Sequence, residues 1–549
     1  MKKKMKAGYF YDMLKDWKVV RENGRWIFSF PREGTFYPYG FTQKHSGCAD
    51  FMDFAGVFII VNEKAAEIMK VTVCFGDGKE ISCGLPVAEG RKRLVKAAFE
   101  DFPLETGKET PWQYVNRIIL ETEGEILSCR AQRREYVFAD FPVKGKSEKV
   151  GETVVYNGKI INCSRERIQV SASQLYEGWE SMKARIEWQQ PEPGNTVILN
   201  PEEEKEVTVS LSVHDYMVPG GHETTRIRFR AQGQATGQEI LRLETMRALE
   251  HPYIYHNKDG WRQVREKIDL YEKYQPAWKE FQRLSEEWLV TSPLEDRDCC
   301  YLTQTENGVM ATAYCYALTG EEMYARKLTD FFRRFSDREN GYPKKKKGCH
   351  QSYVQEGHFF QHLAIAYDII YDCVSLTEED REAVEYCLRL YMDMLDGHIR
   401  SGQISNWLIS EILGAIYSAM VLQDAERIER FVFGTGGCIQ QFSKGIFNDG
   451  WWHECSMGYN TWVSSMMLHM AHAMRPFGYD LAYQKFAVPF NKEINSTYGL
   501  EPPIVLSGMY NQKWGGNRRS AVGIKDMFDA VVPFLDYRGV MFGVADSDE

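Results

Sequence analysis

The sequence predicts a multidomain β + α protein, with β-sandwich modules in its N-terminal half followed by an incomplete (α/α) toroid. Its 549 residues are too many for one hydrophobic core, so several domains are expected. Short alternating or β-branched segments, separated by Gly, Pro, Asn and Asp, fill the chain up to about residue 245. After about residue 250, apolar residues recur at three- and four-residue spacing, which is the period of α-helices.

Five segments of the first half have the pattern of strands. They are VFIIV (57–61), IMKVTVCF (68–75), RIQVSAS (167–173), KEVTVSLSV (205–213) and TTRIRFRAQG (224–233). Residues 1–140 are expected to form a jelly-roll-like β-sandwich, and residues 141–245 an immunoglobulin-like β-sandwich. The resemblance to sugar-binding jelly rolls is loose, so a purely structural role is favoured for this half.

Residues 250–549 are expected to form antiparallel helix pairs joined by short turns. One example is ENGVMATAYCYALTGEEMYARKLTDFFRRF, a helix, an LTG turn with a C-capping glycine, and a second helix. Thr377 and Asp380 have the spacing of a capping box at the start of another helix. Repeated pairs build an α/α toroid or a helical solenoid. The absence of a fixed-period sequence repeat favours the toroid.

Charge and composition narrow the classes of partner. The formal net charge is −10, so no basic excess is available to neutralise nucleic-acid phosphates. A local basic cleft on an acidic surface can still bind a polyanionic substrate. No segment has the uninterrupted apolar length that a membrane span needs. Neither a nucleic acid nor a membrane is therefore expected as a partner, and the sequence does not reveal the oligomeric state.

The N-terminal segment and the cysteines indicate the cellular compartment of the protein. The N-terminal MKKKMKAGYFYDMLKDW is basic but lacks the apolar core of a secretory signal. The 13 cysteines are scattered and form no CxxC arrangement, which is typical of a reduced compartment. We expect a cytoplasmic protein, although a chain trimmed of its signal would look the same.

The first candidate site segment is GQISNWLISEILGAIYSAMVL (402–422). Ser405 can cap a helix that has an apolar face, which places Asn406 and Trp407 in its first turn. These two side chains are therefore expected at the N-terminus of that helix.

The second candidate segment is FNDGWWHECSMGYNTW, which leads into another apolar helix. We expect that helix to start near Asn460, with Tyr459 just before it and with His453 and Glu454 in the preceding loop. Asn406 and Tyr459 then both lie at helix N-termini, and in a toroid of alternating helices such ends can share one rim. A helix N-terminus favours negative charge, which suits a uronate carboxylate or a phenolate.

These residue types suit β-elimination of a 4-linked uronic acid. The reaction removes the proton at C5, alpha to a carboxylate. An amide such as that of Asn406 can hydrogen-bond the carboxylate and stabilise the enolate-like charge that develops there. A base must reach C5 and an acid must protonate the leaving O4. A tyrosine can do both if its surroundings lower the phenol pKa, and a neighbouring histidine can support or replace it.

The stretch from about residue 300 onward resembles the heparinase II/III-like and alginate-lyase-like toroid polysaccharide lyases. The motifs that carry the resemblance are YALTGEEMYARK (316–327), AYDIIYD (366–372), DGWWHECSMGY (449–459) and FGVADSD (542–548). The resemblance implies that Tyr459 is the catalytic base and acid, and that Asn406 neutralises the substrate carboxylate.

The chain departs from this family in two ways. Many of these lyases have Asn-His where this chain has Asn406 and Trp407. The Asn-Trp pair is similar to that of chondroitin AC-type lyases, in which a histidine precedes the catalytic tyrosine. His453, before Tyr459, has a comparable place and is expected to be the partner base. The sequence stops soon after Asp548, so we expect either that it is truncated before the family's usual C-terminal β-sandwich or that the protein dispenses with that domain.

Further residues are candidates for substrate contact. His358 and His362 have the i, i+4 spacing of metal ligands, but no HExxH glutamate accompanies them, so contact with the substrate is favoured over a metal site. Trp514 offers a ring for stacking, and Arg518 and Arg519 suit sulfate or carboxylate binding. Glu454 is included among the substrate-binding candidates.

The expected chemistry requires no cofactor. A divalent cation stays open, through Asp546 and Asp548, although a solvated acidic terminus is the favoured account of these residues. The expected partner is an acidic polysaccharide or oligosaccharide. The sequence does not reveal which uronate is cut or whether it is sulfated.

Three other functions fit parts of the same pattern. A helical-toroid glycoside hydrolase acting on uronides needs a pair of carboxyl groups, for which Glu454, Glu411 and Asp449 are available. Tyr459→Phe would then have a mild effect. A uronyl C5-epimerase shares the proton abstraction but returns the proton to the opposite face. A non-catalytic glycan-binding protein would explain the sandwiches and the toroid, but not the grouping of the candidate residues.

Overall fold

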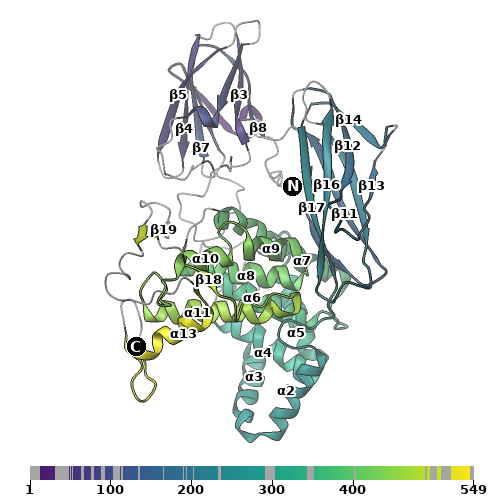
Figure 1. Ribbon diagram of the computed structural model, residues 1–549, viewed down its shortest axis with the longest axis vertical. Helices are drawn as coiled ribbons and strands as arrows, with labels where there is room; N and C mark the ends of the chain where they lie inside the picture. Colours follow the sequence, from purple (N-terminus) through teal and green to yellow (C-terminus); the bar gives the residue numbers. More distant parts are fainter. Residues whose placement is uncertain are drawn as a thin grey trace.

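The computed structural model divides the chain into a β half and an α half, as the sequence predicts (Figure 1). The structure describes residues 13–30, 49, 51, 54–62, 67–75, 79–87, 93–102, 112, 115–133, 137–164, 166–189, 191–192, 194–201, 203–232, 237–290, 303–342, 352–400, 404–488, 491–494, 504–507 and 521–543. The five strand segments expected from the sequence are found as strands β3, β4, β12, β15 and β16.

The first β unit has two antiparallel sheets, with strand orders β1-β2-β7-β4-β5 and β6-β3-β8. The helix before it and its strands are α1 (Met13–Asp16), β1 (Lys18–Glu22), β2 (Arg25–Ser29), β3 (Phe54–Val61), β4 (Ile68–Phe75), β5 (Glu80–Pro86), β6 (Arg93–Ala98), β7 (Val115–Glu121) and β8 (Ile126–Arg133). Both sheets contribute to one hydrophobic cluster, for example through Val71 and Ile118 from the larger sheet and Ile59 and Val95 from the smaller.

The second β unit packs a five-stranded sheet, β10-β17-β16-β12-β14, on a four-stranded sheet, β13-β15-β11-β9. The strands are β9 (Val137–Asp140), β10 (Gly145–Glu148), β11 (Thr153–Asn162), β12 (Ile168–Leu175), β13 (Arg185–Trp188), β14 (Thr196–Leu199), β15 (Glu204–Ser212), β16 (His222–Gln232) and β17 (Gly237–Arg247). Buried side chains alternate along β15 and β16, as the two-residue period of a strand requires when one face is covered. A second, separate hydrophobic cluster fills the space between these sheets.

The α half has its own hydrophobic cluster. Its helices are α2 (Lys258–Leu270), α3 (Gln275–Glu287), α4 (Thr303–Thr319), α5 (Glu322–Phe335), α6 (Ser352–Ile370), α7 (Glu378–Arg400), α8 (Asn406–Val421), α9 (Ala425–Phe433), α10 (Cys438–Gly445), α11 (Met457–Ala473) and α13 (Ile524–Val531). Two short antiparallel strand pairs follow α11, formed by β18 (Phe486–Ala487) with β21 (Ala521–Val522) and by β19 (Asn491–Ile494) with β20 (Ile504–Ser507).

Helix α8 is the centre of the helical half. It contacts α6, α7, α9 and α11, and every one of its residues except Trp407 is buried. Gly357 of α6 lies so close to the carbonyl of Ser410 that a Cβ would have no room, and this glycine lets the two helices meet at their backbones. Helices α4, α6, α8 and α11 are in contact in succession, while α5 and α7 pack against each other and against α4 and α8 respectively.

The predicted capping box of α7 is present. The Thr377 backbone N–H donates to the Asp380 carboxylate at 2.9 Å, and the Asp380 N–H donates to the Thr377 hydroxyl at 3.2 Å. Arg333 of α5 adds two hydrogen bonds to the same carboxylate, at 2.8 and 2.9 Å. This guanidinium is the main cause that lowers the pKa of Asp380 to about 2. The box therefore also ties α5 to α7.

The segment between β17 and α2 is held by two buried side chains of the helical half. Asp368 of α6 accepts hydrogen bonds from the backbone N–H groups of Tyr253 and Ile254, both at 2.9 Å, and lies 2.7 Å from His251 Nδ1. Gln423, after α8, exchanges two hydrogen bonds with the backbone of Leu249, at 2.7 and 3.0 Å. These contacts fix where the chain passes from the second β unit to the helices.

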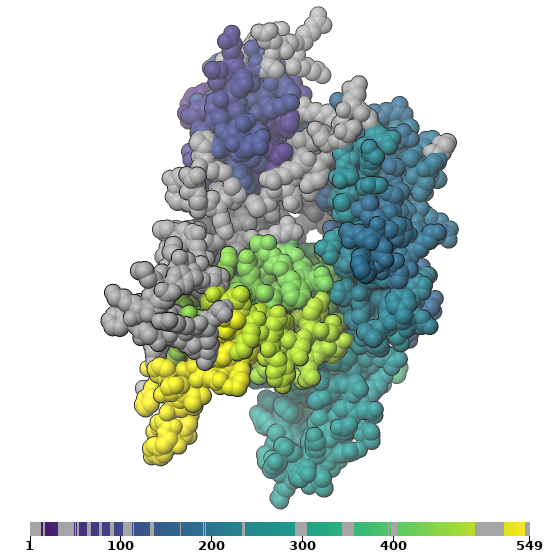
Figure 2. Space-filling view, in the orientation of Figure 1, coloured from purple at the N-terminus to yellow at the C-terminus, as the bar shows by residue number. Residues whose placement is uncertain are grey.

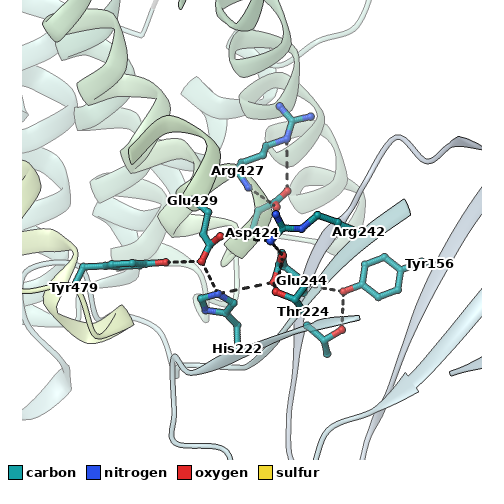
Figure 3. A network of polar contacts seen from close by, with 10 residues as sticks. Tyr156, His222, Thr224, Arg242, Glu244, Asp424, Arg427, Glu429 and Tyr479 are labelled. Carbon is teal, nitrogen blue, oxygen red and sulfur yellow. Dashed lines mark hydrogen bonds and ion pairs between the residues drawn. The ribbon is translucent and has the colours of Figure 1, made fainter. Parts of the chain in front are cut away.

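The second β unit lies against α9 through β10 and β17, and in the space-filling view it borders the green part of the helical half (Figure 2). Gly145 of β10 approaches Asp424, the N-cap of α9, so closely that a Cβ would have no room. Beside it, His222 of β16 hydrogen-bonds Glu429 of α9 at 3.0 Å (Figure 3). Glu429 also accepts from the Tyr479 hydroxyl at 3.4 Å.

The charges around His222 make this contact pH-dependent. The hydrogen bond to Glu429, together with the nearby carboxylate of Glu244, raises the pKa of His222 above its usual value, while burial and, to a smaller extent, Arg242 oppose this. His222 lowers the pKa of Glu429 in return. The buried Glu244 is 3.9 Å from His222 and accepts from Arg242 at 3.1 Å and from Thr224. A protonated His222 is therefore favoured in the folded protein.

We predict that His222→Gln destabilises the protein more at about pH 6 than at about pH 9, because the pKa of an unfolded histidine is about 6.5. The folded pKa is raised, so the stabilisation is fully present below that pH and is lost as pH rises through the folded pKa. Glu429 is partly exposed, so the difference should be about 1 kcal/mol. Thermal unfolding at both pH values measures it. An equal loss of stability at the two pH values would contradict the ion pair.

Among the residues that the structure describes, no helix combines the length and the apolar character needed to cross a membrane.

Candidate functional site

The N-terminus of α8 carries the first pair of candidate residues, as predicted. Ser405 is the N-cap, and its hydroxyl accepts a hydrogen bond from the Leu408 N–H at 3.2 Å. The cap places Asn406 at the first position of the helix, where its side chain is only 3% exposed. Trp407 follows and is half-buried, the one residue of α8 that reaches the surface.

The N-terminus of α11 carries the catalytic candidate Tyr459, but the helix starts earlier than the sequence predicts. It begins at Met457 and not near Asn460, because the Ser456 hydroxyl caps it by accepting from the Tyr459 N–H at 3.3 Å. Tyr459 therefore lies within the first turn and is half-buried. Asn460 is fully buried instead, and it accepts from the Trp452 N–H at 2.8 Å and donates to the Met527 carbonyl at 3.1 Å.

The loop before α11 is folded around a buried indole. Trp452 is fully buried and lies against Gly445, where a Cβ would have no room. Gly450 has a φ of 97°, in the left-handed region that favours glycine. Cys455 also has a positive φ, of 55°. These turns direct Glu454, between Trp452 and the helix, back toward the start of α8.

Glu454 joins the two helix N-termini. Its carboxylate accepts from Asn406 Nδ2 at 2.8 and 2.7 Å and from Trp452 Nε1 at 2.5 Å. The starts of α8 and α11 therefore lie close together, since Glu454 is two residues before the cap of α11. The contact fixes the amide orientation, because only the nitrogen can face a carboxylate. Asn406 Oδ1 is buried and accepts no hydrogen bond from the described residues.

Helices α8 and α11 run side by side in the same direction. Asn406 and Glu454 are in contact at their starts, and the Tyr417 hydroxyl of α8 donates to the His469 carbonyl of α11 at 3.0 Å near their ends. Two helix N-termini therefore meet at one place, and their partial positive charges add there. The Glu454 carboxylate lies in this electrostatic setting, which favours negative charge.

His453 lies in the loop, as expected. Its backbone N–H donates to the Gly445 carbonyl at 2.8 Å, and its ring packs near Trp452, with centroids 4.9 Å apart. The side chain is half-buried. His453 is thus held one residue before Glu454 in the loop that precedes α11.

The histidines of α6 face α11 and α4. His358 accepts a hydrogen bond from Trp462 Nε1 at 3.0 Å and stacks on that indole, with centroids 5.6 Å apart. Burial is the main cause that lowers the pKa of His358, and His362 adds to it. His362 lies 2.7 Å from the Glu306 carboxylate of α4. Within the described residues, no group of three or more His, Cys, Asp or Glu is placed to hold a metal ion.

The sequence did not single out Trp462, Glu306 and Ser456 as residues of this site. Trp462 follows Tyr459 by three residues, which places both side chains on neighbouring parts of one helix face, and this spacing was a usable signal. Glu306 had no comparable signal, because it meets His362 only through the packing of α4 on α6.

The three carboxyl groups that could serve a hydrolase differ in burial and in hydrogen bonding. Glu411 is fully buried within α8, and Asp449 is exposed and accepts from the Trp451 N–H at 3.1 Å. Glu454 is engaged by Asn406 and Trp452.

Five of the residues singled out in the sequence lie outside the described residues. They are Trp514, Arg518, Arg519, Asp546 and Asp548.

Comparison with known proteins leaves the family open. No family model matches the chain, and no curated protein matches it. Among solved structures, an alginate lyase from Bacteroides ovatus is 13% identical, with 52% of this chain and 84% of that chain covered and a TM-score of 0.39. Alginate lyase A1-III, as a variant complexed with a tetrasaccharide, is 16% identical, with 36% and 62% covered and a TM-score of 0.30.

A third similar structure is of another kind. The native conformation of E. coli alpha-2-macroglobulin is 11% identical, with 85% of this chain and 31% of that chain covered and a TM-score of 0.20. With TM-scores below 0.5, none of these likenesses carries an argument about activity. The functional case therefore rests on the residues at the two helix N-termini.

Proposed function

We propose that this protein is a polysaccharide lyase that cleaves uronic-acid-containing glycans by β-elimination. The observation that carries the proposal is the junction of two helix N-termini, at which Glu454 orients the amide of Asn406 beside the turn that holds Tyr459. An amide donor, a phenol and two helix dipoles are the groups that an elimination next to a carboxylate needs.

Asn406 is proposed to bind the substrate carboxylate through its second amide hydrogen. Its nitrogen reaches both oxygens of Glu454 at nearly equal distances, 2.8 and 2.7 Å, so the two oxygens share one hydrogen. The other hydrogen of the planar amide diverges widely from the first and is left for a ligand. A donor held in advance at the place where enolate charge develops stabilises the transition state without reorganising.

Tyr459 is proposed to act first as base and then as acid. Its phenolate oxygen takes the C5 proton, the C4–O4 bond breaks, and the same phenol returns a proton to O4. The products are a C4=C5 unsaturated uronate on one fragment and a free hydroxyl group on the other, and no water is consumed. Its place in the first turn of α11 supports this role, because a helix N-terminus stabilises the phenolate.

Other candidates have supporting roles in the proposal. His453 is the partner base, and Trp407 and His358 contact the substrate, since all three are half-buried side chains on the elements that form the junction or line it. Trp514, Arg518 and Arg519 remain proposed contacts of the substrate. The reaction as written needs no cofactor.

We propose that residues 250–549, which carry this site, form an α/α toroid. It follows β-sandwiches at 1–140 and 141–245 along the chain. Support comes from the succession of contacts α4–α6–α8–α11, from the packing of α5 on α7, and from the shared direction of α8 and α11. In such an arrangement the N-termini of neighbouring inner helices open on one rim, where the candidate residues lie.

Ultraviolet absorbance of the C4=C5 unsaturated uronate tests the proposed activity. The protein is incubated with alginate, unsulfated and sulfated chondroitin, hyaluronan and heparan sulfate, and absorbance and reducing ends are followed together. We expect both to rise in parallel with at least one glycan. Reducing ends without absorbance would identify a hydrolase. Solvent deuterium entering the uronate without cleavage would identify an epimerase, and either result would reject the lyase.

A further inference from the structure

A cavity lies near the C-terminal end of α11, lined by residues from that helix, α2, α3 and α4. Its volume is about 560 Å³, within the range of small-ligand sites. Its wall combines the aromatic rings of Tyr255, Trp261, Phe281 and Tyr314 with aliphatic side chains and with the imidazoles of His256, His469 and His472. Leu468, 46% exposed, shows that the cavity opens to solvent along α11.

The cavity is joined to the candidate site by one side of α11. His469 follows Tyr459 by ten residues, which corresponds to about 15 Å along a helix. Between them, Trp462 and the α6 histidines His358 and His362 provide partly exposed polar and aromatic surface. His362 in turn contributes to lowering the pKa of His469, so the two imidazoles are neighbours. The same face thus leads from the junction to the cavity.

The lining suits an uncharged ring. None of the described residues that line the cavity is Asp, Glu, Lys or Arg, so an anion would lose its hydration without gaining a counter-charge. Burial lowers the pKa of His469, and burial together with His472 and Lys267 lowers the pKa of His256. These imidazoles are therefore neutral at pH 7 and offer hydrogen-bond donors and acceptors. Aromatic faces attract the C–H groups of a ring through their quadrupole.

We propose that this cavity is a distal subsite that holds an uncharged sugar ring of the glycan whose uronate lies at Asn406 and Tyr459. The inference rests on the proposed function and narrows its substrate class. Glycans in which uronates alternate with uncharged hexosamines are accommodated, because one ring type meets the helix N-termini and the other meets the aromatic wall. Homopolymers of uronate place a carboxylate in the cavity and are disfavoured.

Calorimetric titration with oligosaccharides of increasing length tests the subsite. The Tyr459→Phe protein is used so that no ligand is consumed, and the probes are unsulfated chondroitin and alginate oligosaccharides of two to eight rings. We expect the affinity for chondroitin to rise at least about tenfold once the chain is long enough to reach the cavity. Alginate of equal length should gain less than about threefold.

Two variants test whether the rise in chondroitin affinity with chain length comes from the cavity. Leu468→Trp places a bulky ring at the cavity opening, and His472→Ala removes an exposed imidazole that lines the cavity. Each variant should reduce the rise in affinity at least about threefold. The matched control is Met323→Trp, at an exposed position of α5, which should retain the full gain. Equal gains in Leu468→Trp and Met323→Trp, or equal gains for alginate and chondroitin, would overturn the subsite. If no uronate oligosaccharide binds at any length, the proposed function itself fails.

Discussion

The Tyr459→Phe variant is expected to lose a factor of about 10²–10⁴ in kcat on any uronate glycan that the wild type cleaves, because one hydroxyl group serves as both base and acid. The loss should come with little change in thermal stability, since the side chain is half-buried and its ring is retained. The measurement is the initial rate of unsaturated-uronate formation, with unfolding followed by circular dichroism.

The control for this variant is Tyr483→Phe, whose residue is 84% exposed. It removes the same hydroxyl group from the surface and should have the wild-type rate. A Tyr459→Phe protein that retains more than about a third of the wild-type kcat would exclude Tyr459 as the proton-transfer group. Such a result would favour a hydrolase, for which the phenol is not needed.

Asn406→Ala is expected to lower kcat by about 10²–10³, the size of effect seen when one preorganised donor to a developing negative charge is removed. The truncation also deprives the Glu454 carboxylate of the amide that it contacts at 2.7 and 2.8 Å, so a lower melting temperature should accompany the loss of activity. Steady-state kinetics and thermal unfolding of the same preparation measure the two effects. Asn340→Ala, at an exposed turn, is the control.

Glu454→Gln separates orientation from substrate binding. If Glu454 orients Asn406, as the hydrogen bonds indicate, this change lowers kcat and leaves KM nearly constant, because glutamine keeps one acceptor oxygen but loses the charge. If Glu454 instead contacts the substrate, as the sequence analysis expected, KM changes most. A wild-type kcat in both Asn406→Ala and Glu454→Gln would contradict the proposed role of the junction.

Local sequence patterns predicted those features of the structure, such as helix caps, that depend on residues close together in the sequence. Ser405 as the cap of α8 and the Thr377–Asp380 box were predicted because each needs only residues three positions apart. The start of α11 was predicted wrongly by three residues. The apolar pattern begins after Asn460, whereas the cap is Ser456, and the burial of Asn460 that permits this depends on Met527, far along the chain.

Contacts between distant segments could not be read from the sequence. Glu454 meets Asn406 across 48 residues, and His222 meets Glu429 across 207, so neither pairing has a spacing that a local pattern can report. The cavity near the C-terminal end of α11 is a similar case, since Trp261 and His469 line it together only once α2, α4 and α11 have come together in the fold. A candidate residue could be named where one segment carries the pattern, as with Tyr459 near the start of α11, but contacts that packing creates could not be predicted.

Cleavage in water enriched in ¹⁸O, followed by mass spectrometry of the fragments, tests elimination most directly. The wild-type protein is incubated with the glycan that it degrades fastest, and the masses of the fragments are measured after short and long incubations. We predict that the two fragments together have the mass of the substrate and that neither contains ¹⁸O from the cleavage, because elimination adds no water. One ¹⁸O atom per bond broken would show hydrolysis and contradict the account.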